Sequence, residues 1–549
     1  MTKIFTAQNR TIVLVSLFIM LTGNYSFFRH FLEIYPPSLD NMLFILSVSV
    51  FFTMANVAFF LLICHGESAK WLMALYLITA SLAAYYMDQY SVIIDTVMID
   101  NIAQTDTQEF LGLLNANLFI RLFIFGVLPA WIILKYAPVV HDVRSELKSK
   151  LTILLLCIMT MLVVSVPFSA GYASFIREHK ITRAYLNPTY FSYSLLKYIK
   201  EHITTEQLTS LTPVAMDAFE TEPKHKNELI ILVVGETARA DRFSLNGYAK
   251  ETNPALKKQN VVSFSNVSSC GTSTGESVPC MFSILNRKDF SRDKALHMEN
   301  ALDVLQRNGV EILWRDNNSD SKGVATRMRY ENFKSPTMNT ACDSECRDIG
   351  MLGGLDAYIK SKSDKDILIV LHQMGNHGPE YYRRYPKAFE RFKPACKSNE
   401  LRNCSQQEID NAYDNAILYT DYFLSKVIDF LKQYDGEYET AMVYTSDHGE
   451  SLGEHGMYLH AAPYMIAPKE QTHIPAIVWM GKHFDFNIDQ IKPLKDYPLS
   501  HDHLFCALLM GFEVATKTCE LTNKVLQDNA ALKLAAVASS LPESKGLRD

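Results

Sequence analysis

The sequence has no block of Lys or Arg, no zinc-finger spacing and no interleaving of basic with aromatic residues, and its 549 residues carry a net charge of −6. These absences exclude a nucleic-acid partner. A small-residue cleavage site does not clearly follow the first apolar stretch, and further apolar stretches succeed it. This pattern disfavours a cleaved signal peptide and predicts a retained membrane anchor.

The chain is too long for one ordinary domain, and its apolar residues are concentrated in the first third. Five stretches there each approach the roughly 20 residues that cross a bilayer. They span residues 11–28, 41–64, 71–86 (the shortest), 118–136 and 151–173. We therefore expect a transmembrane domain of five helices over residues 1–173.

The connections between these stretches carry an uneven distribution of basic residues. If five crossings are threaded in order, one side receives Lys3, Arg10, Lys70, Lys135, Arg144, Lys148 and Lys150. The opposite side has Arg29 and almost nothing else that is basic. The positive-inside rule then places the N-terminus in the cytoplasm and everything beyond residue 173 outside it.

Eight of the ten cysteines lie in this outer region, where an oxidising compartment permits disulfides. Their spacing predicts three local bridges, Cys270 with Cys280, Cys342 with Cys346, and Cys396 with Cys404. Zinc binding is the alternative for the second pair, but no further Cys or His pair accompanies it. Cys506 and Cys519 form either a fourth bridge or buried thiols. Cys64 and Cys157 are expected to be packing residues within the membrane stretches.

The outer segment 88–116 contains acidic residues but no Lys or Arg. Such a loop could receive a cationic headgroup. Within it, Asn101, Thr105 and Glu109 recur every four residues, which would align them on one face of a helix. The alternative is an ordinary solvated polar face.

The remainder of the chain divides by composition. Basic and aromatic residues mix over 175–203, which predicts an interfacial helical connector. The polar segment 204–227 is expected to be a linker. We assign the connector and the linker together to residues 174–227. From residue 228, apolar runs alternate with helical patterns, which favours a largely parallel sheet covered by helices over 228–529. We expect strands near 229–234, 310–314, 366–371, 441–444 and 474–480, helices near 408–431 and 500–510, and a disordered tail over 530–549.

Polar residues with metal-binding side chains follow two of these predicted strands. Glu236 comes directly after one strand, and Asp447 and His448 come after another. Ends of parallel strands are where α/β enzymes hold ligands, and mixed carboxylate and imidazole donors suit zinc or manganese better than calcium. A capping or salt-bridged role is the alternative for each residue taken alone. Jointly they predict a metal site.

A hydroxyl-rich turn, S-C-G-T-S-T-G-E-S-V-P-C over residues 269–280, lies between these strands in sequence. Thr274 precedes a predicted helix, whose first N–H groups favour an anionic phosphate. A divalent ion beside this hydroxyl would make it lose its proton more readily. Thr272 and Ser273 remain rival nucleophiles at this point. The C-x-P-x-R motif of sulfatases does not begin at Cys270 or at Cys280.

Five segments carry specific motifs: G-E-T-A-R-A-D (235–241), S-C-G-T-S-T (269–274), W-R-D-N-N-S-D-S-K-G (314–323), H-Q-M-G-N-H-G-P (372–379) and S-D-H-G-E-S-L-G-E-H-G (446–456). With these motifs, nearly the whole chain resembles the lipid A phosphoethanolamine transferases, an integral-membrane family that includes the mobile colistin-resistance enzymes. The resemblance implies a five-helix transmembrane domain followed by an α/β/α domain like those of alkaline phosphatases and sulfatases.

The resemblance also implies roles for individual residues. Thr274 would be the nucleophile, and Glu236, Thr274, Asp447 and His448 would surround the principal zinc ion, which is favoured over manganese. Lys322, His377 and His460 would contact the transferred phosphate, and one or both histidines would assist proton transfer or a second metal. Glu450 would lie in the outer shell, and Asn101, Thr105 and Glu109 would lie near the donor headgroup.

The chemistry predicted in this way is a two-step transfer. The Thr274 oxygen would take phosphoethanolamine from phosphatidylethanolamine and release diacylglycerol, and a lipid A phosphate would then displace the threonine. The added ammonium would weaken attraction to polymyxins. We expect a monomer in the bacterial inner membrane with its catalytic domain in the periplasm. The alternatives are a transferase with another acceptor or headgroup, a phosphodiesterase and a non-catalytic lipid-binding sensor.

Overall fold

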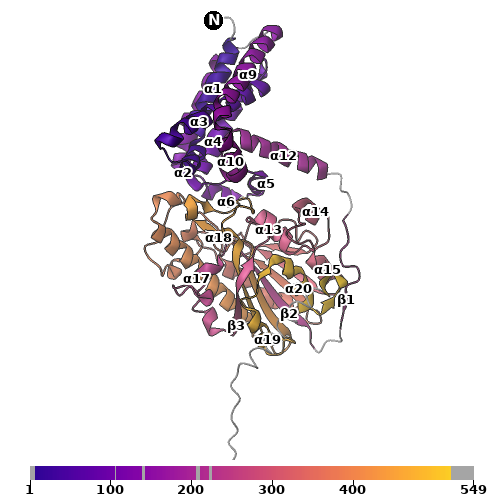
Figure 1. The fold of residues 1–549 in the computed structure, drawn as a ribbon. Helices are drawn as coiled ribbons and strands as arrows, with labels where there is room; N and C mark the ends of the chain where they lie inside the picture. The colour runs from indigo at the N-terminus through magenta and orange to yellow at the C-terminus, as the bar shows by residue number, and fades with distance from the viewer. Residues whose placement is uncertain (1–5, 106, 139–141, 206–210, 222–225, 521–549) are drawn as a thin grey trace, which may run out of the picture. The chain divides into compact units, whose positions relative to one another are not determined.

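The computed structural model describes residues 6–105, 107–138, 142–205, 211–221 and 226–520 (Figure 1). The chain forms two compact units. The first comprises Met1–Ile102 and Leu113–Thr204, and the second comprises Ala103–Gly112 and Thr205–Asp549. The predicted tail over 530–549 lies outside the described residues.

The first unit is helical. Its core forms where α1 (Ala7–Gly23), α3 (Leu39–Ile63), α4 (Ser68–Tyr90) and α9 (Val143–Ser165) pack together, with Ile12, Phe60 and Leu77 among the buried side chains. The other helices are α2 (Tyr25–Ile34), α5 (Thr96–Gln104), α7 (Ala116–Leu122), α8 (Leu128–Tyr136), α10 (Ser169–Glu178), α11 (Lys180–Ala184) and α12 (Thr189–Thr205). The predicted connector over 175–203 is therefore helical for most of its length.

Three helical segments among the described residues are long and apolar enough to cross a membrane, namely Leu39–Ile63, Ala116–Tyr136 and Arg144–Arg177. α1 and α2 are bent by 60° and count as a fourth if the pair forms one span. The remaining predicted stretch, 71–86, lies within α4, which is not among these segments. The structure thus confirms an apolar helical region, and the number of five crossings stays a prediction.

The second unit is built on an eight-stranded sheet with the order β11-β3-β10-β7-β2-β6-β4-β5. All neighbouring strands are parallel except β10, which is antiparallel to both β3 and β7. The strands are β2 (Glu228–Gly235), β3 (Val261–Ser268), β4 (Glu311–Asp316), β5 (Arg329–Asn332), β6 (Ile367–His372), β7 (Glu439–Ser446), β10 (His473–Met480) and β11 (Leu499–Ser500). The largely parallel sheet is confirmed, and β3, β5 and β11 are additions to the predicted strands.

Both faces of this sheet are covered by helices (Figure 1). Every residue of β2 is buried, and its side chains alternate between two apolar cores. One core includes α17 (Gln406–Leu431) and α16 (Leu355–Lys360), and the other includes α13 (Thr274–Met281), α15 (Ala301–Arg307) and α20 (Leu504–Gly511). The predicted helix over 500–510 starts later than expected, because a 3₁₀ turn occupies His501–His503.

Four disulfides link Cys270 to Cys280, Cys342 to Cys346, Cys396 to Cys404, and Cys506 to Cys519. The first three are the predicted pairs, and the fourth resolves the alternative left open by the sequence. Cys64 and Cys157 are free and buried.

Candidate active site

The predicted metal-binding residues meet where two neighbouring parallel strands end. Gly235 and Ser446 are paired in register as the last residues of β2 and β7, so Glu236 and Asp447 leave the sheet side by side. The backbone N–H of Asp447 donates to the Gly235 carbonyl over 2.9 Å. A Cβ on Gly235 would lie 2.6 Å from the Tyr444 side chain, so the packing of this ring against the end of β2 requires glycine.

Glu236, Asp447 and His448 form a buried cluster whose candidate ligand atoms all lie within 4.8 Å of one another. His448 Nε2 lies 3.5 Å from Glu236 Oε1 and 3.3 Å from Asp447 Oδ2. Among the residues that the structure describes, neither of these carboxylate oxygens has a hydrogen-bond partner. A buried site with unpaired acceptors on each side favours a bound cation.

The electrostatics of this cluster fit a divalent metal. His448 Nδ1 donates to the Gly449 carbonyl over 2.8 Å, so its Nε2 lone pair points towards two carboxylates. Burial lowers the pKa of His448 to about 4, which keeps the imidazole neutral. Burial raises the pKa of Asp447 to about 6, and burial followed by the charge of Asp447 raises the pKa of Glu236. A cation between these groups would remove the repulsion, and one carboxylate pair with one imidazole is a donor set that suits zinc.

Thr274 is the hydroxyl residue that reaches this cluster. It is the first residue of α13, and its Oγ1 donates to Glu236 Oε2 over 3.1 Å and lies 3.4 Å from His448 Nε2. Thr272 Oγ1 instead donates to the Ala462 carbonyl over 2.7 Å. Of the rival hydroxyls, Thr274 thus contacts the cluster and Thr272 does not, while Ser273 is the N-cap residue of α13. The identity of the nucleophile stays a prediction.

Asn318 is a site residue that the sequence reasoning did not single out. Its Nδ2 donates to Glu236 Oε2 and to the Gln373 carbonyl, each over 2.7 Å. The backbone N–H of Asn318 donates to Asp316 Oδ1, and Asp316 Oδ2 accepts from His372 Nδ1 over 2.8 Å. The signal for Asn318 was its place within the W-R-D-N-N-S motif directly after β4.

Two further histidines line the same region. The His460 ring lies 4.5 Å from the His448 ring and 5.4 Å from the His377 ring, measured between centroids. His460 Nδ1 lies 2.8 Å from Glu450 Oε2, and the Tyr381 hydroxyl donates to Glu450 Oε1 over 2.7 Å. Glu450 thus contacts His460 and is not part of the metal cluster itself, and its outer-shell position stays a prediction.

The remaining predicted site residues are Lys322 and the three polar residues of the acidic outer segment 88–116. Lys322 is buried and has a left-handed backbone with φ 53°. α5 ends at Gln104 and α6 (Thr107–Gly112) starts anew, so Thr105 is not helical and the expected single helical face for Asn101, Thr105 and Glu109 is wrong. The side chain of Glu109 lies outside the described residues.

Both the helical part and the sheet domain of the chain match known protein families. Residues 52–203 match the family model described as phosphoethanolamine transferase EptA/EptB, and residues 228–510 match the sulfatase model. The phosphatidylethanolamine transferase Mcr-2 of Escherichia coli is 43% identical over 91% of this chain and 94% of its own length. The phosphoethanolamine transferase EptA of Escherichia coli K12 is 36% identical over 94% of this chain and 96% of its own.

Solved structures extend this likeness to three dimensions. The integral membrane phosphoethanolamine transferase EptA from Neisseria meningitidis superimposes with a TM-score of 0.89 at 33% identity, over 95% of this chain and 98% of that one. The soluble domain of the same protein matches with a TM-score of 0.54 at 40% identity, over 59% of this chain and 98% of that one. The full-length match includes the helical part as well as the sheet domain.

Proposed function

The chain belongs to the family of EptA and Mcr phosphoethanolamine transferases, and we propose that it transfers phosphoethanolamine from phosphatidylethanolamine to a phosphate group of lipid A. The single observation that carries the proposal is the contact of Thr274 Oγ1 with Glu236 within the buried cluster at the ends of β2 and β7. This contact places a nucleophilic oxygen beside a set of metal-binding side chains, as phosphoryl transfer requires.

In the first step, Thr274 Oγ1 attacks the phosphorus of phosphatidylethanolamine, and the bond from phosphorus to the glycerol oxygen breaks. Diacylglycerol leaves with a proton on that oxygen, and phosphoethanolamine stays on Thr274. In the second step, an oxygen of a lipid A phosphate attacks the same phosphorus, the bond from phosphorus to Thr274 Oγ1 breaks, and the Thr274 oxygen regains a proton. The two steps use one site in turn and stabilise the same charge distribution twice.

Different residues would contribute to different parts of this reaction. Glu236 Oε2 accepts the Thr274 hydrogen bond and orients the oxygen. A zinc ion held by Glu236, Asp447, His448 and Thr274 would supply positive charge that favours loss of the hydroxyl proton and offsets charge on the phosphoryl oxygens. Glu450 holds His460 Nδ1, and we propose that His460 Nε2 exchanges protons with the leaving and entering oxygens.

Lys322 and His377 complete the proposed phosphate contacts, and Asn101, Thr105 and Glu109 are proposed to bind the donor headgroup. Lys322 supplies a buried positive charge that suits a phosphate. The ring of His377 next to His460 supports a place beside the transferred group. A second metal at these histidines stays part of the proposal.

We further propose five membrane crossings, with residues 228–529 on the periplasmic side of the bacterial inner membrane and the protein as a monomer. The 23 residues of α4 give a helix of about 35 Å, which exceeds the roughly 30 Å of a hydrocarbon core. Four disulfides in the second unit support an oxidising compartment. Reporter fusions after each helix and light scattering in detergent test the topology and the oligomeric state.

The decisive experiment measures the intact mass of purified wild type and Thr274→Ala after incubation with phosphatidylethanolamine alone. We expect a phosphoethanolamine adduct at Thr274 in the wild type and none in the variant. Lipid A extracted from a Gram-negative host expressing each protein should carry phosphoethanolamine only with the wild type, and polymyxin resistance should follow that adduct. Steady release of free phosphoethanolamine without a lipid acceptor would instead identify a phosphodiesterase.

A further inference from the structure

His501 connects the turn that carries Thr274 with the strand end that carries Asp447. Its Nδ1 accepts the backbone N–H of Cys270 over 3.1 Å, and its Nε2 donates to the Ser446 carbonyl over 3.0 Å. The side chain is buried and uses both ring nitrogens. Cys270 begins the turn that ends at Thr274, and Ser446 directly precedes Asp447.

A second link runs beside the first. The Ser277 hydroxyl, on the first turns of α13, donates to the Asp447 carbonyl over 2.5 Å and accepts the Gly271 N–H over 3.3 Å. Ser277 Oγ also lies 3.4 Å from His501 Nδ1. The imidazole therefore joins a small buried network that fixes the nucleophile turn, the start of α13 and the end of β7 to one another.

We propose that His501 is a positioning residue for the transfer reaction, which holds the Thr274 oxygen in register with the metal-binding side chains. The expected effect of His501 on the reaction rate rests on the proposed function. Its expected effect on the geometry of the metal cluster does not. His501 contacts neither the proposed metal ligands nor the substrate in these hydrogen bonds. His501 acts on the site through its hydrogen bonds to the backbone of Cys270 and Ser446. Because each bond uses a different ring nitrogen, substitutions can remove one bond and keep the other.

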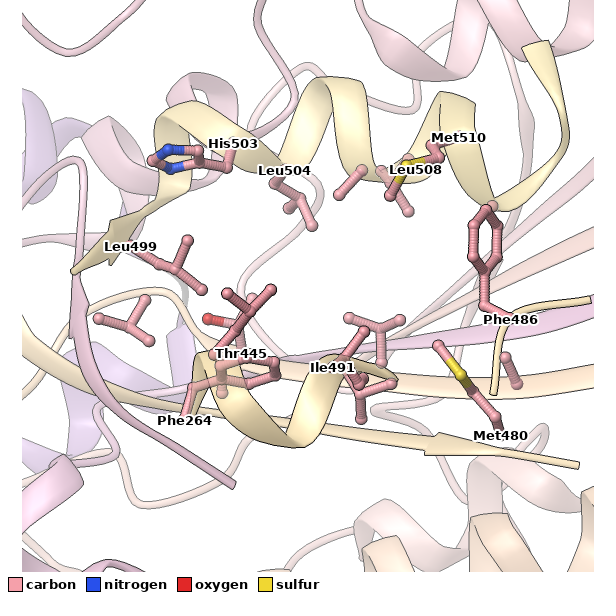
Figure 2. Close-up of a pocket in the computed structure, with 18 of the residues that line it drawn as sticks. Phe264, Thr445, Met480, Phe486, Ile491, Leu499, His503, Leu504, Leu508 and Met510 are labelled. Carbon is pink, nitrogen blue, oxygen red and sulfur yellow. The ribbon is translucent and has the colours of Figure 1, made fainter. Parts of the chain in front are cut away.

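The surroundings of His501 allow its side chain to be changed without overpacking. An apolar cavity of about 520 Å³ lies between α20, the 3₁₀ turn before it and the sheet (Figure 2), and His501 is one of its lining residues. Figure 2 shows Leu499, His503 and Leu504 toward one end of this cavity. A shorter or more flexible amide at position 501 can therefore be accommodated.

Two amide substitutions separate the two hydrogen bonds. Asn at 501 can place Oδ1 where Nδ1 lies and keep the Cys270 contact, whereas Gln can place Nε2–H near the Ser446 carbonyl and lose the Cys270 contact. Because Cys270 leads into the turn that carries Thr274, we expect His501→Gln to lower kcat more than His501→Asn does. His501→Gln should lower kcat by about 10- to 100-fold and leave KM for phosphatidylethanolamine within twofold of wild type.

The matched control is His503→Asn. His503 lies on the same 3₁₀ turn and lines the same cavity, but within the described residues its Nδ1 contacts Ser500 alone. This variant should keep wild-type kcat and zinc affinity. Each full-length variant is purified in detergent, its folded fraction is measured by size exclusion, and rates are expressed per folded protein.

Zinc affinity, measured by competition with a chelator, gives a readout that does not depend on the reaction. We expect His501→Gln to weaken zinc binding by about 10-fold, since the ligands lose their fixed spacing. Wild-type zinc affinity and kcat in both His501 variants, or losses that only follow the folded fraction, would overturn the proposal. If the wild type itself transfers nothing, the proposed function fails, and zinc affinity alone decides whether His501 positions the cluster.

Discussion

Thr274 Oγ1 donates a hydrogen bond to Glu236 Oε2 over 3.1 Å, which joins the N-terminus of α13 to the end of β2. The same carboxylate oxygen accepts from Asn318 Nδ2 over 2.7 Å. Glu236 is therefore oriented by two donors while its other oxygen faces His448. This arrangement would let one residue aim the proposed nucleophile and bind a cation at the same time, and it requires four segments of the chain to converge, those of Glu236, Thr274, Asn318 and His448.

The hydroxyl at position 274 is expected to be essential, whereas its methyl group is not. Thr274→Ala should reduce transfer to background, and Thr274→Ser should keep activity within about tenfold of wild type, because the hydroxyl can still meet Glu236. Product formation from fluorescent phosphatidylethanolamine measures both. An active Thr274→Ala protein would remove Thr274 from the reaction.

Metal removal should expose the repulsion between the two buried carboxylates. Without metal, Asp447→Asn should unfold at the same temperature as wild type or higher, because it removes one charge that burial penalises. With zinc at about 100 times its dissociation constant, wild type should gain roughly 2.7 kcal/mol and overtake the variant.

Thermal unfolding of both proteins in chelator and in zinc tests this reversal in the order of stability. Asp435→Asn serves as a control, since Asp435 accepts from the Lys482 N–H away from the cluster. A wild-type protein that is more stable than Asp447→Asn even after complete metal removal would contradict the prediction.

The disulfide between Cys270 and Cys280 encloses the segment that contains Thr274. Replacing both cysteines by Ser should cost about 3 kcal/mol of unfolding free energy, as expected for a loop of this length, and should also lower kcat. The Cys506–Cys519 pair closes a loop of similar length without any proposed site residue. Its double Ser variant should lose similar stability but keep kcat per folded protein, as measured by denaturation and by transfer assays.

The candidate metal ligands could be predicted from the sequence because Glu236 and Asp447 follow β2 and β7 directly, within three residues of the end of each strand's continuous apolar run. Parallel strands buried on both faces leave this clear signal. β3 was missed because Ser263 and Ser265 interrupt its apolar residues on the less buried face. The antiparallel direction of β10 was also inaccessible, since an apolar run reads the same in either direction.

Asn318, whose only sequence signal was its place in the W-R-D-N-N-S motif, and His501 were missed for a different reason. Each acts through one or two hydrogen bonds to residues far away in sequence, and neither repeats at a helical or strand period. The expected helical face at Asn101, Thr105 and Glu109 failed because the chain leaves the helix after Gln104. A four-residue spacing cannot by itself show that a helix continues.

Stability should respond to pH through Asp421, a buried residue of α17. It accepts the backbone N–H groups of Ala255 and Leu256 over 2.8 and 2.9 Å, and burial raises its pKa to about 7 from 3.8. The folded state therefore binds more protons than the unfolded state between these values. The stabilising contribution is fully present below pH 3.8 and is lost as pH rises through 7, by about 4 kcal/mol in all.

Thermal unfolding of wild type and Asp421→Asn between pH 4 and 8 isolates this effect. The variant can have a different stability at every pH, but the wild type should lose stability relative to it as pH rises. Parallel curves for the two proteins would show that Asp421 does not titrate in this range.

The contact between Glu450 and His460 should control proton transfer rather than binding. His460 Nδ1 lies 2.8 Å from Glu450 Oε2, and a carboxylate there stabilises a protonated imidazole. Burial raises the pKa of Glu450 to about 7, so the carboxylate carries its full charge only above that pH. Glu450→Gln keeps the shape but removes this charge, so above pH 7 we expect kcat to fall by about 10- to 100-fold with KM and zinc affinity within twofold of wild type. Tyr381→Phe removes only the hydroxyl that donates to Glu450 Oε1, and it should have a smaller effect. Transfer assays across pH on both variants measure the difference. Wild-type kcat in Glu450→Gln would show that His460 does not depend on this carboxylate, and the proton would then have to pass through another group.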